Sequence, residues 1–181
     1  MSQIVVVSGP PGAGKSTVCE SLCQRYDRTV HILIDDVQSW IRMGFIPPYK
    51  PESFQQTLTI ARAAARAAVA FAHDRYGVFI EGVIGPDVLD AMIEELTQAG
   101  LAIHHAMLLP TADALIQRAH DRAQVNAGVT DDMYRQVQAM FAGWSMPGIT
   151  IDNTTLSADQ SADRIMDACG RGEALVWSPE D

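Results

Sequence analysis

Lysine and net positive charge are scarce in this chain. Lysine occurs only at Lys15 and Lys50. The 22 acidic residues outnumber the 13 Lys and Arg residues, which gives the 181 residues a formal net charge of −9. Nucleic acids and anionic membrane surfaces attract proteins that carry an excess of positive charge. We therefore expect neither nucleic acid nor a membrane among the partners.

Cysteine and long apolar runs are also in short supply. Cys19, Cys23 and Cys169 show no CxxC spacing and have no histidine cluster beside them, so a zinc site is not expected. Apolar runs fall short of the ~18 residues of a membrane span, and the start of the sequence lacks the basic segment of a signal peptide. We expect a cytoplasmic protein whose cysteines serve packing.

Short β-branched apolar runs alternate with longer helical patterns, which is typical of an α/β fold with a parallel sheet. Because the runs are apolar throughout, helices are expected to cover both faces of the sheet. Five strands are predicted, at residues 4–7, 30–34, 78–80, 102–109 and 149–151. Seven helices are predicted, at residues 15–26, 37–43, 52–75, 86–98, 111–124, 131–144 and 158–169.

Residues 1–181 are expected to form a single domain, because neither a repeat nor a linker interrupts them. Within it we expect acceptor-side helices at residues 37–75, a short lid at residues 118–135 and a partly disordered tail at residues 170–181. Five positions carry signals for helix ends: Thr111, Thr130 and Ser157 as N-caps, and Gly44 and Gly100 as C-terminal caps.

The segment that opens the first predicted helix fills every fixed position of the Walker A pattern. It reads Gly9, Pro10, Pro11, Gly12, Ala13, Gly14, Lys15, Ser16 and Thr17. A strand pattern precedes it and a helical pattern follows, so the glycines can direct backbone N–H groups at a phosphate. Lys15 is expected to reach the β- and γ-phosphates, and Ser16 to hold Mg²⁺. The alternative, a Gly/Pro turn that merely starts a helix, has no use for the Lys-Ser pair.

Carboxylates follow two other predicted strands, at the sheet edge where the phosphate loop lies. Asp35 and Asp36 end the second strand, and we assign Asp36 as the catalytic base that accepts a proton from the acceptor hydroxyl. An N-cap role for Asp36 is the alternative. Glu81 and Gly82 end the third strand, where Glu81 is expected to hold a Mg²⁺-bound water or the acceptor. An acidic cap exposed to solvent is the alternative for Glu81.

Two arginines lie at the start of the predicted lid region. Arg118 and Arg122 are four positions apart on one helix face, just before the Gly-containing segment 125–130. At a lid edge they are expected to neutralise charge on the transferring phosphoryl group. Ion pairing with Asp113 or Asp121 on the surface is the alternative.

The acceptor region carries two opposing signals. Trp40 shares a helix face with Asp36, so Trp40 and the nearby Arg42 are expected to line a pocket that suits an apolar acceptor with a hydroxyl. Such an aromatic stripe also occurs as simple core packing. Arg62 and Arg66 share a face of the third helix and would instead clasp an anionic acceptor. The identity of the acceptor stays open at this point.

The chain resembles the adenylate-kinase-like group of P-loop small-molecule kinases, and particularly proteins similar to chloramphenicol phosphotransferase. Five segments carry the resemblance: GPPGAGKST at 9–17, IDD at 34–36, WIRMGFIPP at 40–48, FIEGVIGP at 79–86 and IDNTTLS at 151–157. The resemblance implies a P-loop NTPase fold with ATP and Mg²⁺ as cofactors.

The resemblance also implies roles for single residues. Asp36 matches the base position, and Arg118 and Arg122 match the lid arginines. The loop beside adenine corresponds to Asn153, Thr154 and Thr155. Glu81 departs from the pattern, because many relatives carry Asp there, and the lid is short.

These features together predict a kinase that moves the γ-phosphoryl group of ATP to a hydroxyl of a small metabolite or antibiotic. A nucleoside monophosphate kinase is one alternative, and a kinase acting on a nucleotide sugar is another within the same architecture. A nucleotide-hydrolysing switch or nucleotide-gated binding module is an alternative of a different class. The Asn-Lys-x-Asp signature typical of guanine-specific switches is absent, since neither lysine follows an asparagine.

Overall fold

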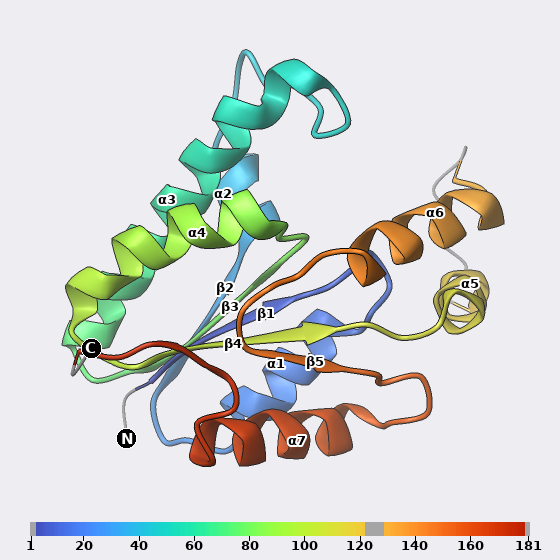
Figure 1. The fold of residues 1–181 in the computed structure, drawn as a ribbon. Helices are drawn as coiled ribbons and strands as arrows, with labels where there is room; N and C mark the ends of the chain where they lie inside the picture. Colours follow the sequence, from blue (N-terminus) through green and yellow to red (C-terminus); the bar gives the residue numbers. More distant parts are fainter. Residues whose placement is uncertain (1–2, 122–128, 180–181) are drawn as a thin grey trace.

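The computed structural model of the protein describes residues 3–121 and 129–179, and its helices lie on both faces of one sheet (Figure 1). The strands are β1 (Ile4–Ser8), β2 (Thr29–Leu33), β3 (Gly77–Gly82), β4 (Ile103–Leu108), β5 (Ile149–Ile151) and β6 (Leu175–Trp177). The first five run parallel in the order β2-β3-β1-β4-β5. The loop after β1 therefore lies at the carboxyl edge of the sheet, flanked by the ends of β3 and β4.

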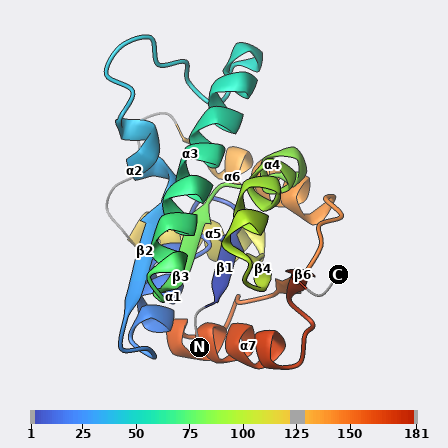
Figure 2. The ribbon, with the colours of Figure 1, turned by 90° about the vertical axis from the view of Figure 1, so that its left-hand side faces the viewer.

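Helices cover both faces of this sheet, and α5 and α6 lie beyond its carboxyl edge (Figure 1). Their bounds are α1 (Lys15–Cys23), α2 (Ile34–Ser39), α3 (Phe54–His73), α4 (Pro86–Leu96), α5 (Ala112–Asp121), α6 (Asp131–Ala142) and α7 (Ala158–Gly170). Short 3₁₀ turns precede α3 at Pro51–Ser53 and follow α4 at Thr97–Ala99. Figure 2 shows the start of α3 and the segment that leads into it projecting away from the sheet.

An apolar core lies on each face of the sheet, because neighbouring residues of a strand face opposite sides. Val6 and Ile80 pack with the alanine-rich face of α3 and with α4. Val5, Val7 and Phe79 pack with α1 and α7. A fully buried Ile or Val is worth about 1.5–3 kcal/mol relative to an exposed one, so the strands are held chiefly by these contacts. The prediction of a parallel sheet between helices is confirmed.

The predicted number of five strands is wrong, because a sixth strand forms from the tail. β6 pairs antiparallel with β4, and the His105 N–H donates to the carbonyl of Ala174 at 2.9 Å. The turn at Gly172, with φ of +74°, reverses the chain after α7. Ala174 is fully buried, so the described part of the tail is packed rather than disordered as expected.

Several predicted helix ends are corrected. α2 begins at Ile34 with Leu33 as its N-cap, so Asp36 lies in the first turn and its alternative reading as an N-cap is wrong. Gly44 does not cap a helix, because α2 ends at Ser39.

Other predicted ends are confirmed. The hydroxyl of Thr130 accepts from the Met133 N–H, and Ser157 forms a complete capping box. Gly100 adopts a left-handed conformation at the end of its 3₁₀ turn.

The cysteines are free thiols, and Cys19 is buried against the sheet. Burial raises the pKa of the Cys19 thiol well above its usual range, and burial raises the pKa of Cys169 to about 11. Both thiols therefore stay protonated near pH 7, as their packing role requires. Across residues 3–121 and 129–179, the helices are too short or too polar to cross a bilayer.

Candidate functional site

The phosphate loop takes a shape that only certain residues can adopt. Gly9 and Gly14 have φ angles of +150° and +91°, a region that favours glycine. A Cβ atom at Gly9 would stand 2.4 Å from the carbonyl oxygen of Leu108, so no side chain fits there. Lys15 follows as the first residue of α1. The loop thus presents the amino end of a helix, which favours a bound anion.

Lys15 folds back over this loop rather than out to solvent. Its Nζ donates to the carbonyls of Gly9 and Pro10, each at 3.1 Å, and the residue is 9% exposed. The apolar stem is buried while the ammonium group lies above the helix start. A phosphate bound at that helix start would be within reach of the same ammonium group.

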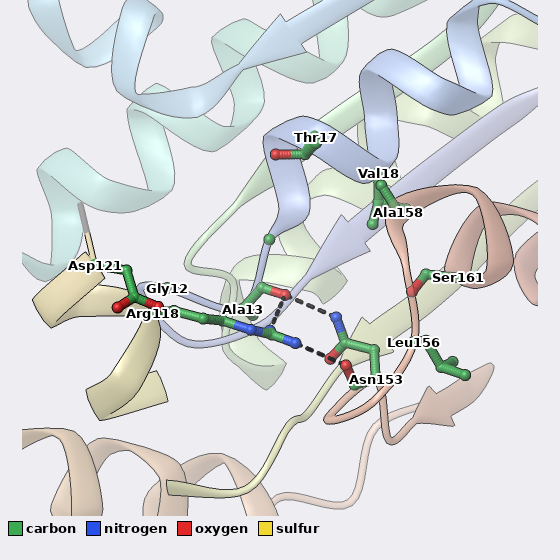
Figure 3. A pocket seen from close by; sticks show the side chains of 11 residues that line it. Gly12, Ala13, Thr17, Val18, Arg118, Asp121, Asn153, Leu156, Ala158 and Ser161 are labelled. Carbon is green, nitrogen blue, oxygen red and sulfur yellow. Dashed lines mark hydrogen bonds between the residues drawn. The ribbon is translucent and has the colours of Figure 1, made fainter. Parts of the chain in front are cut away.

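A cavity of about 340 Å³ opens on one side of the loop (Figure 3). It is lined by Gly12, Ala13, Gly14, Thr17, Val18, Arg118, Asp121, Asn153, Leu156, Ala158 and Ser161. The guanidinium of Arg118 lies across it, donating to the carbonyls of Ala13 at 3.2 Å and Asn153 at 2.8 Å. Arg118 therefore joins α5 to the phosphate loop.

Asn153 closes the same cavity from the loop after β5. Its Nδ2 donates to the carbonyl of Ala13 at 2.8 Å, beside the Arg118 bond to that carbonyl. Asn153 is 3% exposed, yet its Oδ1 has no hydrogen-bond partner among the residues that the structure describes. A buried acceptor without a partner costs free energy and is well suited to a donor from a ligand.

The rest of the predicted adenine loop is placed differently. The Thr154 hydroxyl accepts from the Thr111 N–H at 2.8 Å and so fixes the loop to the start of α5. Thr155 is exposed and does not line the cavity. Val18, Leu156 and Ser161 do line it, and the sequence interpretation missed them. The only available signal was spacing: Val18 follows the Walker motif by one residue, and Leu156 precedes the predicted Ser157 cap.

A second cavity, of about 240 Å³, lies on the other side of the loop. Its lining comes from the phosphate loop, the β2–α2 junction and the end of β3: Pro11, Gly12, Lys15, Ser16, Leu33, Ile34, Asp35, Glu81, Gly82 and Val83. Parallel register explains the meeting, because Ser8 of β1 pairs with Gly82 of β3 and Leu33 of β2 pairs with Glu81. The structure thus brings together Lys15, Ser16, Asp35, Glu81 and Gly82.

Ser16 and Glu81 form the candidate magnesium site. The Ser16 hydroxyl donates to Glu81 Oε1 at 2.5 Å, and Glu81 is 5% exposed. Mg²⁺ takes oxygen ligands and commonly needs only one or two protein groups beside phosphates and waters. A hydroxyl and a carboxylate side by side next to the phosphate loop fit that requirement. Within the described residues there is no cluster of three or more His, Cys, Asp or Glu that would offer a fuller metal cage.

A histidine stands behind Glu81. His31 Nε2 lies 3.7 Å from Glu81 Oε1, and burial lowers the pKa of His31 although Glu81 opposes the shift. The imidazole is therefore neutral near pH 7.

A second histidine lies between β1 and β4. The hydroxyl of Ser8 in β1 and Nε2 of His105 in β4 are 2.7 Å apart, and His105 Nδ1 is 2.6 Å from the carbonyl of Pro147. Because a carbonyl only accepts, Nδ1 carries the proton and Ser8 donates to Nε2.

The predicted base Asp36 and the aromatic Trp40 do not line either cavity. Both Asp35 and Asp36 are exposed, but Asp35 lines the second cavity and Asp36 does not. Trp40 is 64% exposed and Arg42 is exposed as well. The core-packing alternative for Trp40 is therefore wrong.

The predicted arginine clasp is engaged elsewhere. Arg66 donates two hydrogen bonds to Glu95, from Nε at 2.8 Å and from one Nη at 2.7 Å. Arg62 approaches Glu94 and Glu95 at 3.7 and 3.9 Å. These pairs join α3 to α4, which corrects the expectation that the two arginines hold an anionic acceptor. Arg122 and most of the Gly-containing segment of the lid lie outside the described residues.

Comparisons with known proteins agree with this geometry. Residues 4–147 match the AAA domain family. No curated protein matches the sequence. Three solved structures with similar folds are the tunicamycin resistance protein of Deinococcus radiodurans, the APS kinase of Mycobacterium tuberculosis in complex with AMPPNP and APS, and a gluconokinase from Sinorhizobium meliloti 1021.

The likeness to these structures extends over nearly whole chains. The tunicamycin resistance protein has a TM-score of 0.69 at 19% identity, covering 98% of this chain and 99% of that one. The APS kinase has a TM-score of 0.69 at 14% identity, with 93% and 98% covered. The gluconokinase has a TM-score of 0.65 at 15% identity, with 94% and 93% covered. These likenesses show a P-loop NTPase-like fold, and by its sequence match the chain belongs to the AAA domain family.

Proposed function

We propose that the protein transfers the γ-phosphoryl group of MgATP to a hydroxyl group of a small molecule. The observation that carries this proposal is the pair of cavities that meet at the phosphate loop, where Gly12 lines both. One cavity offers a shape and a buried acceptor suited to a base. The other gathers a lysine, a hydroxyl and two carboxylates. A nucleotide laid across Gly12 would have its base on the first side and its γ-phosphate on the second.

The nucleotide is proposed to be ATP. The orphaned Oδ1 of Asn153 accepts hydrogen bonds, and the exocyclic amino group of adenine donates one. Guanine carries a carbonyl oxygen at the equivalent ring position, which an acceptor repels. The planar guanidinium of Arg118 lies in the same cavity and supplies a face for stacking against the base.

Ser16 and Glu81 would hold Mg²⁺ beside the phosphates. Bound there, the ion would neutralise negative charge on the phosphates. Lys15, the first residue of α1, adds a second positive charge. The N–H groups of the helix start add partial positive charge. Charge that develops on the transferring group is therefore stabilised by groups that are already in place.

Asp35 is proposed as the base, in place of the predicted Asp36, because Asp35 lines the second cavity with Lys15 and Ser16. The acceptor oxygen attacks the γ-phosphorus while the bond to the ADP oxygen breaks. The carboxylate of Asp35 takes the proton that the acceptor hydroxyl gives up. Asp36 is the alternative base, and the transfer rates of the Asp35→Asn and Asp36→Asn variants distinguish the two.

The acceptor is proposed to carry an apolar part and no negative charge. Trp40, Met43, Phe45, Tyr49 and Phe54 are all large apolar or aromatic residues left 42–89% exposed. Four of them lie between α2 and α3, and Phe54 is the first residue of α3, so all five follow the Asp35 cavity closely in sequence. Arg62 and Arg66, which would favour an anionic acceptor, are paired with acids of α4. An apolar acceptor would cover the exposed side chains when it binds.

The free thiols at Cys19, Cys23 and Cys169 support a reducing compartment, and we propose the cytoplasm.

The proposed phosphoryl transfer is tested by incubating the protein with MgATP and a panel of hydroxylated compounds, with mass detection of products. The panel includes apolar hydroxylated metabolites and antibiotics, sugars, nucleotide sugars and nucleoside monophosphates. We expect a phosphorylated apolar compound. Phosphorylation of a nucleoside monophosphate would instead identify a nucleotide kinase. ATP hydrolysis to free phosphate, equally fast without any acceptor, would identify a hydrolysing switch.

A further inference from the structure

His31 and Glu81 face each other on neighbouring strands. Leu33 pairs with Glu81 in the parallel register, and His31 is two positions before Leu33, so all three lie on the α1 face of the sheet. The side chains of His31 and Glu81 are 17% and 6% exposed. This contact lies behind the Ser16–Glu81 pair, away from the second cavity, whose lining does not include His31.

His31 Nε2 is buried and has no hydrogen-bond partner among the described residues. Such an atom costs free energy, and its presence calls for an explanation. Its distance of 3.7 Å from Glu81 Oε1 is beyond the range of a good hydrogen bond. A shift of about half an ångström would bring the two atoms within that range. Glu81 Oε1 already accepts from Ser16, so a second donor would fix the same oxygen from the other side.

We propose that His31 is a positioning residue for the magnesium site, with its Nε2–H donating to Glu81 Oε1. Ser16 and His31 then hold one carboxylate oxygen between them, and the other oxygen, Oε2, is left for the hydration shell of the ion. This role rests on the proposed function, because it assumes that Ser16 and Glu81 bind Mg²⁺. Groups that orient a metal-binding carboxylate in this way strengthen metal binding without touching the ion.

Two amide substitutions separate this role from a packing role. In His31→Gln the side-chain amide reaches the position of Nε2 and keeps a donor for Glu81. In His31→Asn the amide ends near the position of Nδ1 and does not reach. Both replacements are polar and smaller than or similar to histidine, so they differ mainly in that one hydrogen bond. Thermal midpoints of both variants report whether the fold is kept.

The experiment is calorimetric titration with ADP, once with excess Mg²⁺ and once with a chelator. His31→Asn is expected to weaken ADP binding about tenfold with Mg²⁺ and to leave binding without metal unchanged. His31→Gln is expected to bind close to the unmodified chain in both conditions. In a Glu81→Gln background, where no carboxylate is left to orient, the difference between the two His31 variants should vanish.

Equal Mg²⁺-dependent binding by the Asn, Gln and unmodified proteins would overturn the positioning role alone. The same conclusion would follow if the Asn variant lost binding equally with and without metal, or if the difference persisted in the Glu81→Gln background. A failure of the unmodified protein to bind ADP more tightly with Mg²⁺ would refute the proposed function as well. If His31→Asn does not fold, His31→Leu replaces it as the variant without a donor, and the same outcomes decide.

Discussion

The nucleotide side and the acceptor side of the phosphate loop are built in contrasting ways. On the nucleotide side, Arg118 and Asn153 both donate to the carbonyl of Ala13, and Lys15 donates to two loop carbonyls. On the acceptor side, the segment between α2 and α3 makes its hydrogen bonds within itself and to the adjoining ends of α2 and α3, as in the bond from the Ser53 hydroxyl to the carbonyl of Pro48. The clearest is the pair of hydrogen bonds between the Gln56 amide and the backbone of Ile46.

Phosphate binding constrains the sequence more tightly than acceptor binding does. A phosphate and its metal present one fixed geometry, so the loop that binds them needs fixed residue types. Acceptors differ in shape, and the segment that faces them needs only exposed side chains of suitable character. The four predictions below test the two sides separately, beginning with the largest effect.

Removing the loop lysine should abolish the reaction and leave the fold intact. Lys15→Ala deletes the charge nearest the proposed phosphates, and the expected loss in kcat/KM is about 10⁴-fold or more, because binding and transition-state stabilisation both suffer. Steady-state kinetics with the acceptor found by product screening measure it. Arg171→Ala, which removes a surface cation that pairs with Glu173 outside both cavities, is the control and should keep the parental rate. Comparable rates in both variants would show that the loop lysine is not used.

Exchanging single carboxylates decides which one acts on the acceptor. Asp35→Asn should lower phosphoryl transfer by about 10²- to 10⁴-fold while MgATP binding stays intact, since the amide cannot take a proton. Asp36→Asn is the matched neighbour and should have a much smaller effect, because Asp36 does not line the cavity. Single-turnover rates measure both. The reverse order would restore Asp36 as the base, and two parental rates would direct attention to Glu81.

The nucleotide side should respond to a change at its buried amide. Asn153→Ala removes the bond to Ala13 and the acceptor for the base, so ATP affinity should fall about tenfold and the preference for ATP over GTP should shrink. Thr155→Ala is the control, because Thr155 is exposed and outside the cavity. Competition binding with the two nucleotides measures the preference. A larger effect at Thr155 than at Asn153 would place the base elsewhere.

The smallest expected effect concerns His105 and the pH dependence of the free energy of unfolding. Burial lowers the pKa of His105 below its ordinary value of 6.5, so the unfolded chain binds a proton there more readily than the folded one. Stability is therefore fully present above pH 6.5 and declines as the pH falls below it. Lowered pKa values at His31 and His104 act in the same direction. Urea unfolding at about pH 7 and about pH 5 measures this. In His105→Gln the decline should be shallower, and an unchanged decline would exclude His105 as a contributor.

Much of the nucleotide side could be predicted from the sequence. Local backbone geometry requires Gly9 and Gly14, and phosphate binding requires Lys15. These requirements act within nine consecutive residues, so the pattern can be recognised from the sequence alone. Glu81 could be placed as well, because the ends of parallel strands meet at one edge. Arg118 was found from its spacing to the lid, although its bonds to loop carbonyls depend on the way α5 packs.

The remaining features depend on contacts between distant residues. The proposed base changes from Asp36 to Asp35 because Asp35 lines the second cavity, and this placement depends on α2, which begins three residues earlier than predicted. β6 is three residues long and is stabilised by pairing with β4, which local composition does not reveal. Arg66 meets Glu95 only because α3 packs along α4.

Calorimetric titration of the unmodified protein with MgATP and with MgGTP tests whether the loop of Gly9 to Thr17 binds MgATP for transfer. We expect one nucleotide bound per chain, tighter binding of ATP than of GTP, and loss of both in Lys15→Ala. Absence of nucleotide binding by the folded parent, or undiminished binding by a folded Lys15→Ala variant, would contradict this role of the loop.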